Sequence, residues 1–224
     1  MTNIDPQTVQ TVQTVQAVKA ALSAARISTY ERSAVANGDA LSLYSWNTSV
    51  SGALLGPLHV CEVVVRNAVA DALARVYGER WPWSPSFEQS LPNPTVGYSP
   101  RRDLFSARRS ATTTGKVIPE LKFVFWQKMF TSRHDLRLWG PHMLDVFPNL
   151  NHTQDIAVSR SKIYSNLEQV RGLRNRIAHH EPIFARNLSD DYRKVAELIG
   201  YRCPLTAAWI DAGQQASAMI AAGP

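Results

Sequence analysis

Apolar residues recur every three or four positions along most of this chain, which is the period of an amphipathic α-helix. The longest such pattern covers residues 41–77, and its apolar stripe consists of Leu54, Leu58, Cys61, Val65, Val69, Ala72 and Val76. Gly56-Pro57 predicts a kink or a division in this segment, because proline removes a hydrogen bond inside a helix. Strand-like alternation is scarce, so the pattern predicts an all-α fold.

The most regular helix is expected over about residues 153–180. Its apolar stripe consists of Ile163, Leu167, Val170, Leu173 and Ile177. Arg171, Arg174 and Asn175 lie beside this stripe or opposite it. Pro182 disfavours helical geometry at Glu181, so the helix should end close to His179 and His180.

The remaining segments predict shorter elements. Residues 78–100 are rich in Pro, Ser and Trp and indicate an ordered loop, with Trp81 and Trp83 packed onto the body of the protein. A short basic helix or loop is expected over residues 101–110. Further helices are predicted over residues 117–131, 136–147, 190–199 and 205–220.

The chain begins with a Thr-Val-Gln triplet that is repeated three times over residues 8–16. A three-residue period suits neither a helix nor a strand, so we expect residues 1–27 to form a mobile extension that becomes helical near residues 18–26. Residues 28–224 are then expected to form a single helical domain. The repeat indicates no function.

Composition places the chain among ordinary globular proteins, with 224 residues, 45% hydrophobic and 19% charged. The two cysteines, Cys61 and Cys203, lack metal-ligand spacing and favour a reduced, cytoplasmic compartment. The first 25 residues lack the pattern of a secretory signal, and no run of about 18 apolar residues suggests a membrane span.

A net charge of +6 and a pI near 9.5 indicate an anionic partner. Arginines gather around Asp103, and the cluster consists of Arg101, Arg102, Arg108 and Arg109. Such a cluster suits contacts with phosphate groups. A solvated helical face explains the same pattern equally well.

The string Arg174-Asn175-Arg176-Ile177-Ala178-His179-His180-Glu181-Pro182 carries the clearest chemistry. A guanidinium is a permanent cation with a fork of donors that matches phosphate, and an imidazole can accept and return a proton near neutral pH. Metal-independent cleavage of an RNA phosphodiester requires both. The alternative is structural, because Arg and His in the last turn of a helix also complement its dipole.

Arg174, four intervening residues and His179 resemble the Arg-x4–6-His motif of the HEPN ribonuclease superfamily, with the usual polar residue, Asn175, after the arginine. The longer string over residues 173–184 is similar to the Abi-like branch, which comprises bacterial abortive-infection proteins. Further matches lie in residues 43–47, 62–67, 115–118 and 125–126. The resemblance therefore covers roughly residues 28–200.

This resemblance implies an HEPN-like helical bundle with additional helices and a metal-independent endoribonuclease that needs no cofactor and no metal ion. His179 would accept the proton of a ribose 2′-hydroxyl or protonate the departing oxygen. Arg174 would bind the scissile phosphate, and Asn175 would orient the phosphate or the histidine. His180 fits a five-residue spacing that the superfamily also allows, so both histidines are candidates.

Other residues are candidates for supporting roles. RNA contacts are expected from Arg101, Arg102, Arg108, Arg109, Arg171 and Arg176. Glu62, Arg66 and Asn67 also match the Abi-like pattern and are expected to brace the Arg174 region. Glu62 and Arg66 have a plainer explanation, because oppositely charged side chains four residues apart pair on any helix.

Helix geometry limits how one chain can use the motif. In an ideal helix Arg174 and His179 point about 140° apart, and His180 points about 120° away on the other side. The site can still form if the helix unwinds before His179 or if a symmetric partner supplies the matching half. HEPN ribonucleases use the second solution, so the resemblance implies a homodimer.

The resemblance also implies phage defence or a toxin restrained by an antitoxin, which is either a protein or a small RNA. The alternative function is a catalytically silent HEPN module that dimerises and binds RNA or a partner protein.

Overall fold

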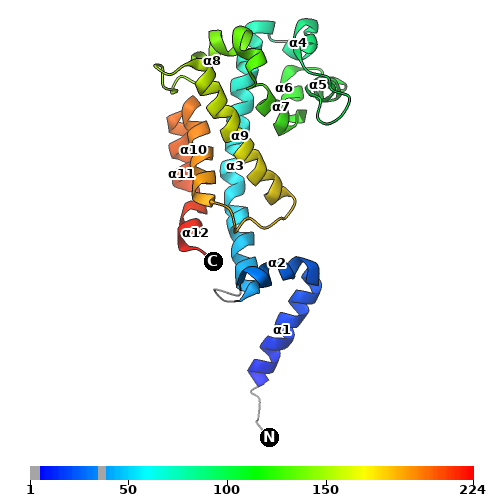
Figure 1. Ribbon diagram of the computed structural model, residues 1–224, viewed down its shortest axis with the longest axis vertical. Coiled ribbons are helices and arrows are strands. Elements are labelled where there is room, and N and C mark those ends of the chain that lie inside the picture. Colours follow the sequence, from blue (N-terminus) through cyan, green and yellow to red (C-terminus); the bar gives the residue numbers. More distant parts are fainter. Residues whose placement is uncertain (1–5, 35–38) are drawn as a thin grey trace. The chain divides into compact units, whose positions relative to one another are not determined.

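The computed structural model describes residues 6–34 and 39–224, and for residues 6–12 only the backbone. These residues form helices joined by turns, and none of them lies in a β-strand, so the predicted all-α class is confirmed. The α-helices, labelled in Figure 1, are α1 (Pro6–Leu22), α2 (Ala24–Ala34), α3 (Ala40–Tyr77), α4 (Pro85–Ser90), α5 (Pro100–Arg108), α6 (Thr114–Val117), α7 (Phe123–Lys128), α8 (Gly140–Val146), α9 (Ile156–Ala178), α10 (Leu188–Arg202), α11 (Pro204–Gly213) and α12 (Ala216–Ala222). Short 3₁₀ turns cover Trp81–Trp83, Ile118–Glu120 and Ser132–His134, and a π-helical turn covers Asp135–Trp139.

The chain divides into two compact units. Unit 1 contains residues 1–53 and 216–224, and unit 2 contains residues 54–215. The division between these units lies within α3, and the C-terminal helix α12 belongs with the N-terminal unit. The domain boundary expected near residue 28 stays a prediction.

Unit 1 contains α1, α2, the first part of α3, and α12. Lys19 on α1 forms an ion pair with Glu31 on α2, at 2.8 Å. The indole nitrogen of Trp46 donates a hydrogen bond to the carbonyl oxygen of Met219, at 3.1 Å, and so ties α12 to α3.

The Thr-Val-Gln repeat lies within α1, so helix begins at Pro6 rather than near residue 18. The described side chains of α1 are mostly exposed. Residues 1–5 of the expected extension lie outside the described residues.

In unit 2, α3 runs through Pro57, so the helix is not divided at Gly56-Pro57, one of the two outcomes that the sequence predicted there. Pro57 and its neighbours Leu54 and Leu58 are buried, and this packing offsets the hydrogen bond that proline cannot make. The predicted stripe is buried apart from Val76, which is partly exposed.

Among the described residues, α3 alone is long and apolar enough to cross a membrane, judged by length and composition. The core helix of a folded domain passes the same test.

Helix α9 packs against α7 and α10, and Figure 1 shows it running alongside α3. Its predicted stripe is buried, with exposures between 0% and 6%. Behind it, Arg186 donates two hydrogen bonds of 2.7 Å to the buried carboxylate of Asp191, and Gln169 of α9 donates a third, at 2.9 Å. This cluster fixes the segment that follows the motif.

The segment between α3 and α9 is more broken than the pattern predicted. The expected loop at 78–100 contains α4, although Trp81 is fully buried as expected. The helix expected over 117–131 is interrupted by a 3₁₀ turn at Pro119 and by extended backbone at Leu121. The helix expected over 205–220 is split after Gly213 into α11 and α12.

Candidate functional site

The candidate site is built on the last two turns of α9. Asp155 caps the start of this helix by accepting hydrogen bonds from the amides of Ala157 and Val158, at 2.7 and 3.2 Å. Such a cap is worth about 1 kcal/mol and fixes the register of the helix. Because the opposite face is buried, Arg174 and Asn175 are held at the surface of unit 2.

The end of α9 is a Schellman motif built on a histidine. The amide of His180 donates to the carbonyl oxygen of Ile177, at 3.0 Å, and the amide of Glu181 donates to that of Arg176, at 2.8 Å. His180 takes the left-handed conformation, with a φ of 57°, in the place that glycine usually occupies. His179 keeps near-helical backbone, with its amide bonded to the carbonyl oxygen of Asn175 at 2.9 Å.

This ending shows that α9 does not unwind before His179. Helix geometry persists through Ala178, so unwinding does not bring Arg174 and His179 together within one chain. Both histidines are exposed beyond the end of the helix, and Arg174 projects from the turn before it. Within one chain Arg174 therefore lies on α9 before its last turn, and the two histidines lie beyond the end of the helix.

Glu62 on α3 connects Arg66 and Arg174. Its carboxylate forms a close ion pair with Arg66 and lies 3.8 Å from the Nε of Arg174, and the Glu62 side chain is only 15% exposed. The sequence singled out these residues for bracing the Arg174 region, and the structure brings Glu62 and Arg66 to it. Asn67 is exposed and takes no part in this network.

The charge of Arg66 is opposed by burial and by the neighbouring Arg174. Its Nε is buried without a hydrogen-bond partner. Burial lowers the pKa of Arg66, the nearby Arg174 acts in the same direction, and Glu62 opposes both. Guanidinium groups remain charged under these conditions, so an anion at this place would relieve the repulsion between the two arginines.

A cleft of about 370 Å³, here called the Arg174 cleft, opens beside this network. Its charged and polar lining consists of Arg66, Glu120, Lys122, Arg171, Arg174 and Asn175, and the rest comes from residues 119, 121, 123 and 124. Four cations thus face one carboxylate, and neither His179 nor His180 lines the cleft. The charge and size suit a phosphate group of a nucleic acid.

Arg171 is positioned in this cleft by a residue that the sequence did not single out. Its Nε donates a 2.7 Å hydrogen bond to the side-chain oxygen of Gln127, which is fully buried on α7. A glutamine within the apolar run Phe123-Val124-Phe125-Trp126 and Met129 was the signal that could have revealed it. A buried amide at that place needs a polar partner.

A second cleft of about 360 Å³, here called the Arg102 cleft, adjoins the first. The two share Glu120 and Lys122 in their linings, and the second also contains Arg102 and Asp103 of α5. Lys122 therefore stands where the clefts meet.

Three arginines of α5 are bonded within the protein. Arg102 donates a 3.2 Å hydrogen bond to the carbonyl oxygen of Gly97 although it lines a cleft. Arg101 donates to the carbonyl oxygens of Gln89 and Leu91, at 2.8 and 3.0 Å. Arg108 donates to the carbonyl oxygen of Pro82, at 2.7 Å, and forms an ion pair with Glu88.

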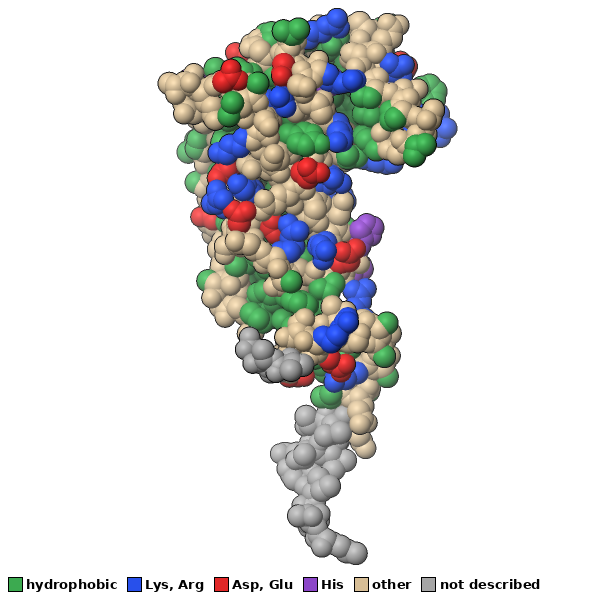
Figure 2. All heavy atoms as spheres, viewed as in Figure 1, with side chains coloured by type: hydrophobic (Ala, Val, Ile, Leu, Met, Phe, Trp, Pro, Cys, Tyr) green, Lys and Arg blue, Asp and Glu red, His purple; other side chains and the backbone are tan. Residues whose placement is uncertain are grey.

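Arg109 and Arg176 line neither cleft. Arg176 donates to the carbonyl oxygen of Pro182, at 3.0 Å, and so secures the turn after α9. Arg109 is exposed. Figure 2 shows one face of the molecule, on which basic and acidic side chains are interspersed over unit 2 rather than gathered into one basic patch. Positive side chains are concentrated in the lining of the Arg174 cleft instead.

No group of three His, Cys, Asp or Glu side chains within the described residues has the arrangement of a metal site. His142 and Asp145 form a 3.3 Å pair on α8, next to Arg75 at 3.5 Å from the same carboxylate. Cys61 is buried, and burial raises the pKa of its thiol to about 12, so it is no nucleophile.

Comparisons of the chain with known protein families, with curated proteins and with solved structures give no match.

Proposed function

We propose that this chain is a metal-independent endoribonuclease of the HEPN superfamily, similar to its Abi-like branch, that cleaves RNA by attack of the substrate's own 2′-hydroxyl. One observation carries the proposal: the arginine of the motif lines a cation-rich cleft and is braced there by Glu62 of another helix. A helix-capping arginine has no need of either feature.

Arg174 is suited to hold the scissile phosphate. Its side chain is 44% exposed, and its nitrogen nearest to Glu62 is Nε, which leaves both terminal nitrogens for a ligand. Within the described residues Arg174 donates no hydrogen bond. Its fork could therefore bind two phosphate oxygens and stabilise the charge that develops on them.

The proton transfers are assigned to the histidines. An imidazole accepts the proton of the 2′-hydroxyl, the 2′-oxygen attacks phosphorus, and the bond from phosphorus to the 5′-oxygen breaks. An imidazolium then protonates the departing 5′-oxygen. The products are a 2′,3′-cyclic phosphate and a 5′-hydroxyl. His179 is the first candidate because of its spacing from Arg174, and His180 is the second.

A complete site requires a second copy of the chain under this proposal. The helical backbone up to His179 separates the two halves of the motif, and a two-fold axis near the end of α9 would place Arg174 of one protomer beside the histidines of its partner. We therefore propose a homodimer with shared active sites.

The biological setting that fits is phage defence by abortive infection, or a toxin restrained by an antitoxin of protein or RNA, in the cytoplasm. The second candidate function is a silent HEPN module that dimerises and binds RNA or a protein. It explains the cation-rich clefts but gives no reason for the exposed pair of histidines beyond the helix end.

The nuclease proposal is tested with purified chain and a structured RNA in excess EDTA. We expect cleavage, an upstream fragment that ends in a cyclic phosphate, and no cleavage where 2′-deoxyribose replaces the ribose at the scissile position. Products with a 5′-phosphate, or activity that requires added magnesium, would show that the site is misassigned. Binding of RNA with no cleavage under any condition would favour the silent module.

The shared site is tested by mixing two inactive variants, Arg174→Ala and His179→Ala. If each site takes its arginine from one protomer and its histidine from the other, a mixed dimer regains one intact site. Random exchange should then restore roughly one quarter of wild-type activity. Mixing Arg174→Ala with the double variant R174A/H179A is the matched control and should restore nothing. Restoration in neither mixture, with exchange verified, contradicts the shared site.

A further inference from the structure

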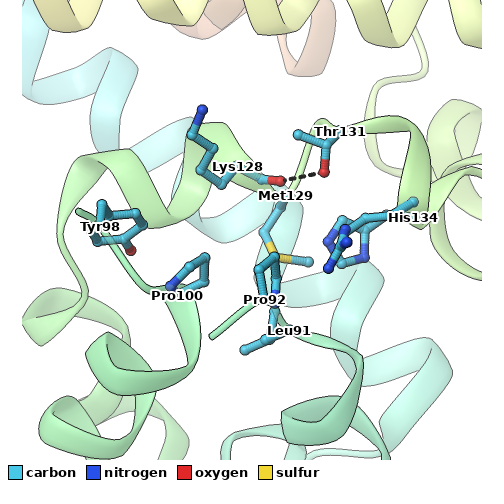
Figure 3. Close-up of a pocket in the computed structure, with 9 residues that line it drawn as sticks. Leu91, Pro92, Tyr98, Pro100, Lys128, Met129, Thr131 and His134 are labelled. Carbon is cyan, nitrogen blue, oxygen red and sulfur yellow. Dashed lines mark hydrogen bonds between the residues drawn. The ribbon is translucent and has the colours of Figure 1, made fainter. Parts of the chain in front are cut away.

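A third cavity in unit 2 shares only Tyr98 with the lining of the Arg102 cleft and no residue with that of the Arg174 cleft. It measures about 210 Å³ and lies between the segment before α5 and the end of α7. Its apolar walls come from Leu91, Pro92, Pro100 and Met129. Figure 3 shows these four side chains between Tyr98 at one end and His134 at the other. The cavity is smaller than the roughly 300 Å³ at which sites for drug-sized ligands begin, so it suits one flat ring system.

His134 supplies a polar group that the protein itself does not use. Only 6% of the residue is exposed, and its ring makes no side-chain hydrogen bond within the described part of the chain. Its ring nitrogens are not among the buried side-chain atoms that lack a partner, so they remain open to solvent. Because His134 lines the cavity, a ligand in the cavity can reach them.

Burial, together with the nearby Arg133, lowers the pKa of His134 to about 4. The ring is therefore neutral at pH 7 and offers one donor and one acceptor. Its counterpart is a ring that carries both kinds of group on one edge, and the edges of nucleobases do.

The rim of the cavity is positively charged. Lys128 and Arg133 contribute to its lining, and no Asp or Glu among the described residues does. Lys128 donates one hydrogen bond of 2.7 Å to the hydroxyl of Tyr164, and Arg133 donates one of 3.3 Å to the carbonyl oxygen of Ser90. Each side chain has further donors for an anion.

The opposite end of the cavity offers an aromatic face. The hydroxyl of Tyr98 donates a 2.7 Å hydrogen bond to Asp103, which holds the ring in place. A fixed aromatic ring can stack on a base, which is a common way of binding unpaired nucleotides.

We propose that this cavity, here called the His134 pocket, binds a nucleotide, with the base between Tyr98 and His134 and the phosphate at Lys128 and Arg133. The nucleotide is either a free mononucleotide or one residue of an RNA chain, and the second case rests on the proposed ribonuclease function. In that case the pocket selects a base at a distance from the cut. Lys128 contacts Tyr164, which precedes Arg174 on α9 by ten residues, or about 15 Å along the helix.

The experiment is a titration of full-length chain labelled with ¹⁵N at histidine. The ligands are the four 5′-mononucleotides, the matching nucleosides, and short oligonucleotides in which every ribose is 2′-deoxy. We expect saturable shifts of the His134 ring signals among the six histidines. Binding of mononucleotides alone identifies a site for free nucleotides, and binding of the oligonucleotides identifies a subsite for the chain. No shift at His134 with any ligand at millimolar concentration overturns the proposal.

Two variants test the assigned contacts. Arg133→Gln should weaken mononucleotide binding by about tenfold and leave nucleoside binding unchanged, because only the phosphate contact is lost. Its matched control is Arg137→Gln, an exposed arginine outside the pocket. His134→Gln should weaken both ligands. Equal losses for Arg133→Gln and Arg137→Gln would refute the phosphate assignment. The titration is read without RNA cleavage, so its failure leaves the nuclease proposal untouched, and failure of cleavage leaves this one untouched.

Discussion

The two arginine clusters of this chain look alike in sequence and differ in what their side chains do. Around α5, Arg101 and Arg108 donate to backbone carbonyl oxygens and hold the segment that precedes the helix. At the end of α9, Arg174 is half exposed, donates no hydrogen bond in the described structure and faces a cleft. Arginine density therefore indicates two different things, local scaffolding and ligand binding, and only the partners of each side chain separate them.

The largest expected difference between the two clusters follows from replacing one arginine of each with alanine. We expect Arg174→Ala to reduce RNA cleavage by about 10²- to 10³-fold, the effect of losing one stabiliser of transition-state charge. Its melting temperature should stay close to that of the wild type, because the side chain is exposed. Initial rates of cleavage of a fluorescent RNA measure the effect.

Arg109→Ala is the control for that variant, because Arg109 is also exposed and lines neither cleft. Cleavage should remain at the wild-type rate. Equal losses in the two variants would mean that general positive charge, rather than the Arg174 cleft, supports activity.

The His134 pocket, which lies between the segment before α5 and the end of α7, should also carry a pH dependence of folding. The pKa of His134 is lowered to about 4 in the folded protein, against about 6.5 when unfolded. The unfolded chain therefore binds the proton first, and stability is lost as the pH falls from about 6.5 towards 4, by at most about 3 kcal/mol. Urea unfolding at a series of pH values measures this loss.

His134→Gln removes the titrating group and should flatten this part of the pH profile. The exposed His152→Gln is the matched control and should keep the wild-type slope. An unchanged slope in a folded His134→Gln variant would assign the pH dependence to other groups.

The sequence predicted helix α9 and part of the candidate site, but not the roles of all the arginines. The periodic stripe of α9 and its end near Pro182 followed from local pattern, and the structure agrees within a few residues. Asn175 and Glu62 could be singled out from the motif. The hydrogen bonds of Arg101 and Arg108 could not be predicted, because their acceptors are carbonyl oxygens 10 to 26 residues away along the chain. Non-local contacts of this kind leave no periodic trace.

Pro57 is the counterexample within the helices themselves. Gly56-Pro57 predicted a kink or a division, yet α3 is not divided, because Pro57, Leu54 and Leu58 are buried. The meeting of the two clefts at Lys122 was equally hidden, since it depends on how residues 119–124 lie against α9 and α5. Tertiary packing decided both outcomes.

The smallest expected effect concerns the path of RNA between the clusters. Arg102→Ala and Lys122→Ala should each weaken RNA binding severalfold, up to about tenfold, and reduce by about 1 the slope of log affinity against log salt. Arg102 is the one arginine of α5 that lines a cleft, so it should behave like the α9 cluster. Fluorescence anisotropy with an uncleavable RNA measures both quantities.

Arg101→Ala completes this test. It should lower the melting temperature, because two carbonyl oxygens lose their donor, and leave the salt slope unchanged. A reduced salt slope in Arg101→Ala with no change in Arg102→Ala would reverse the roles assigned within α5.

The left-handed backbone of His180 places a cost on the stability of the α9 end at a position proposed to act in RNA cleavage. A residue with a Cβ in this conformation costs about 1 kcal/mol or more relative to glycine, so a glycine here would make the end of α9 more stable. The same change would remove an imidazole from the motif. If His180 takes part in proton transfer, selection for thermostability and selection for cleavage should pull this position in opposite directions. A library at residue 180 would then separate into robust, inactive proteins and active, less robust ones.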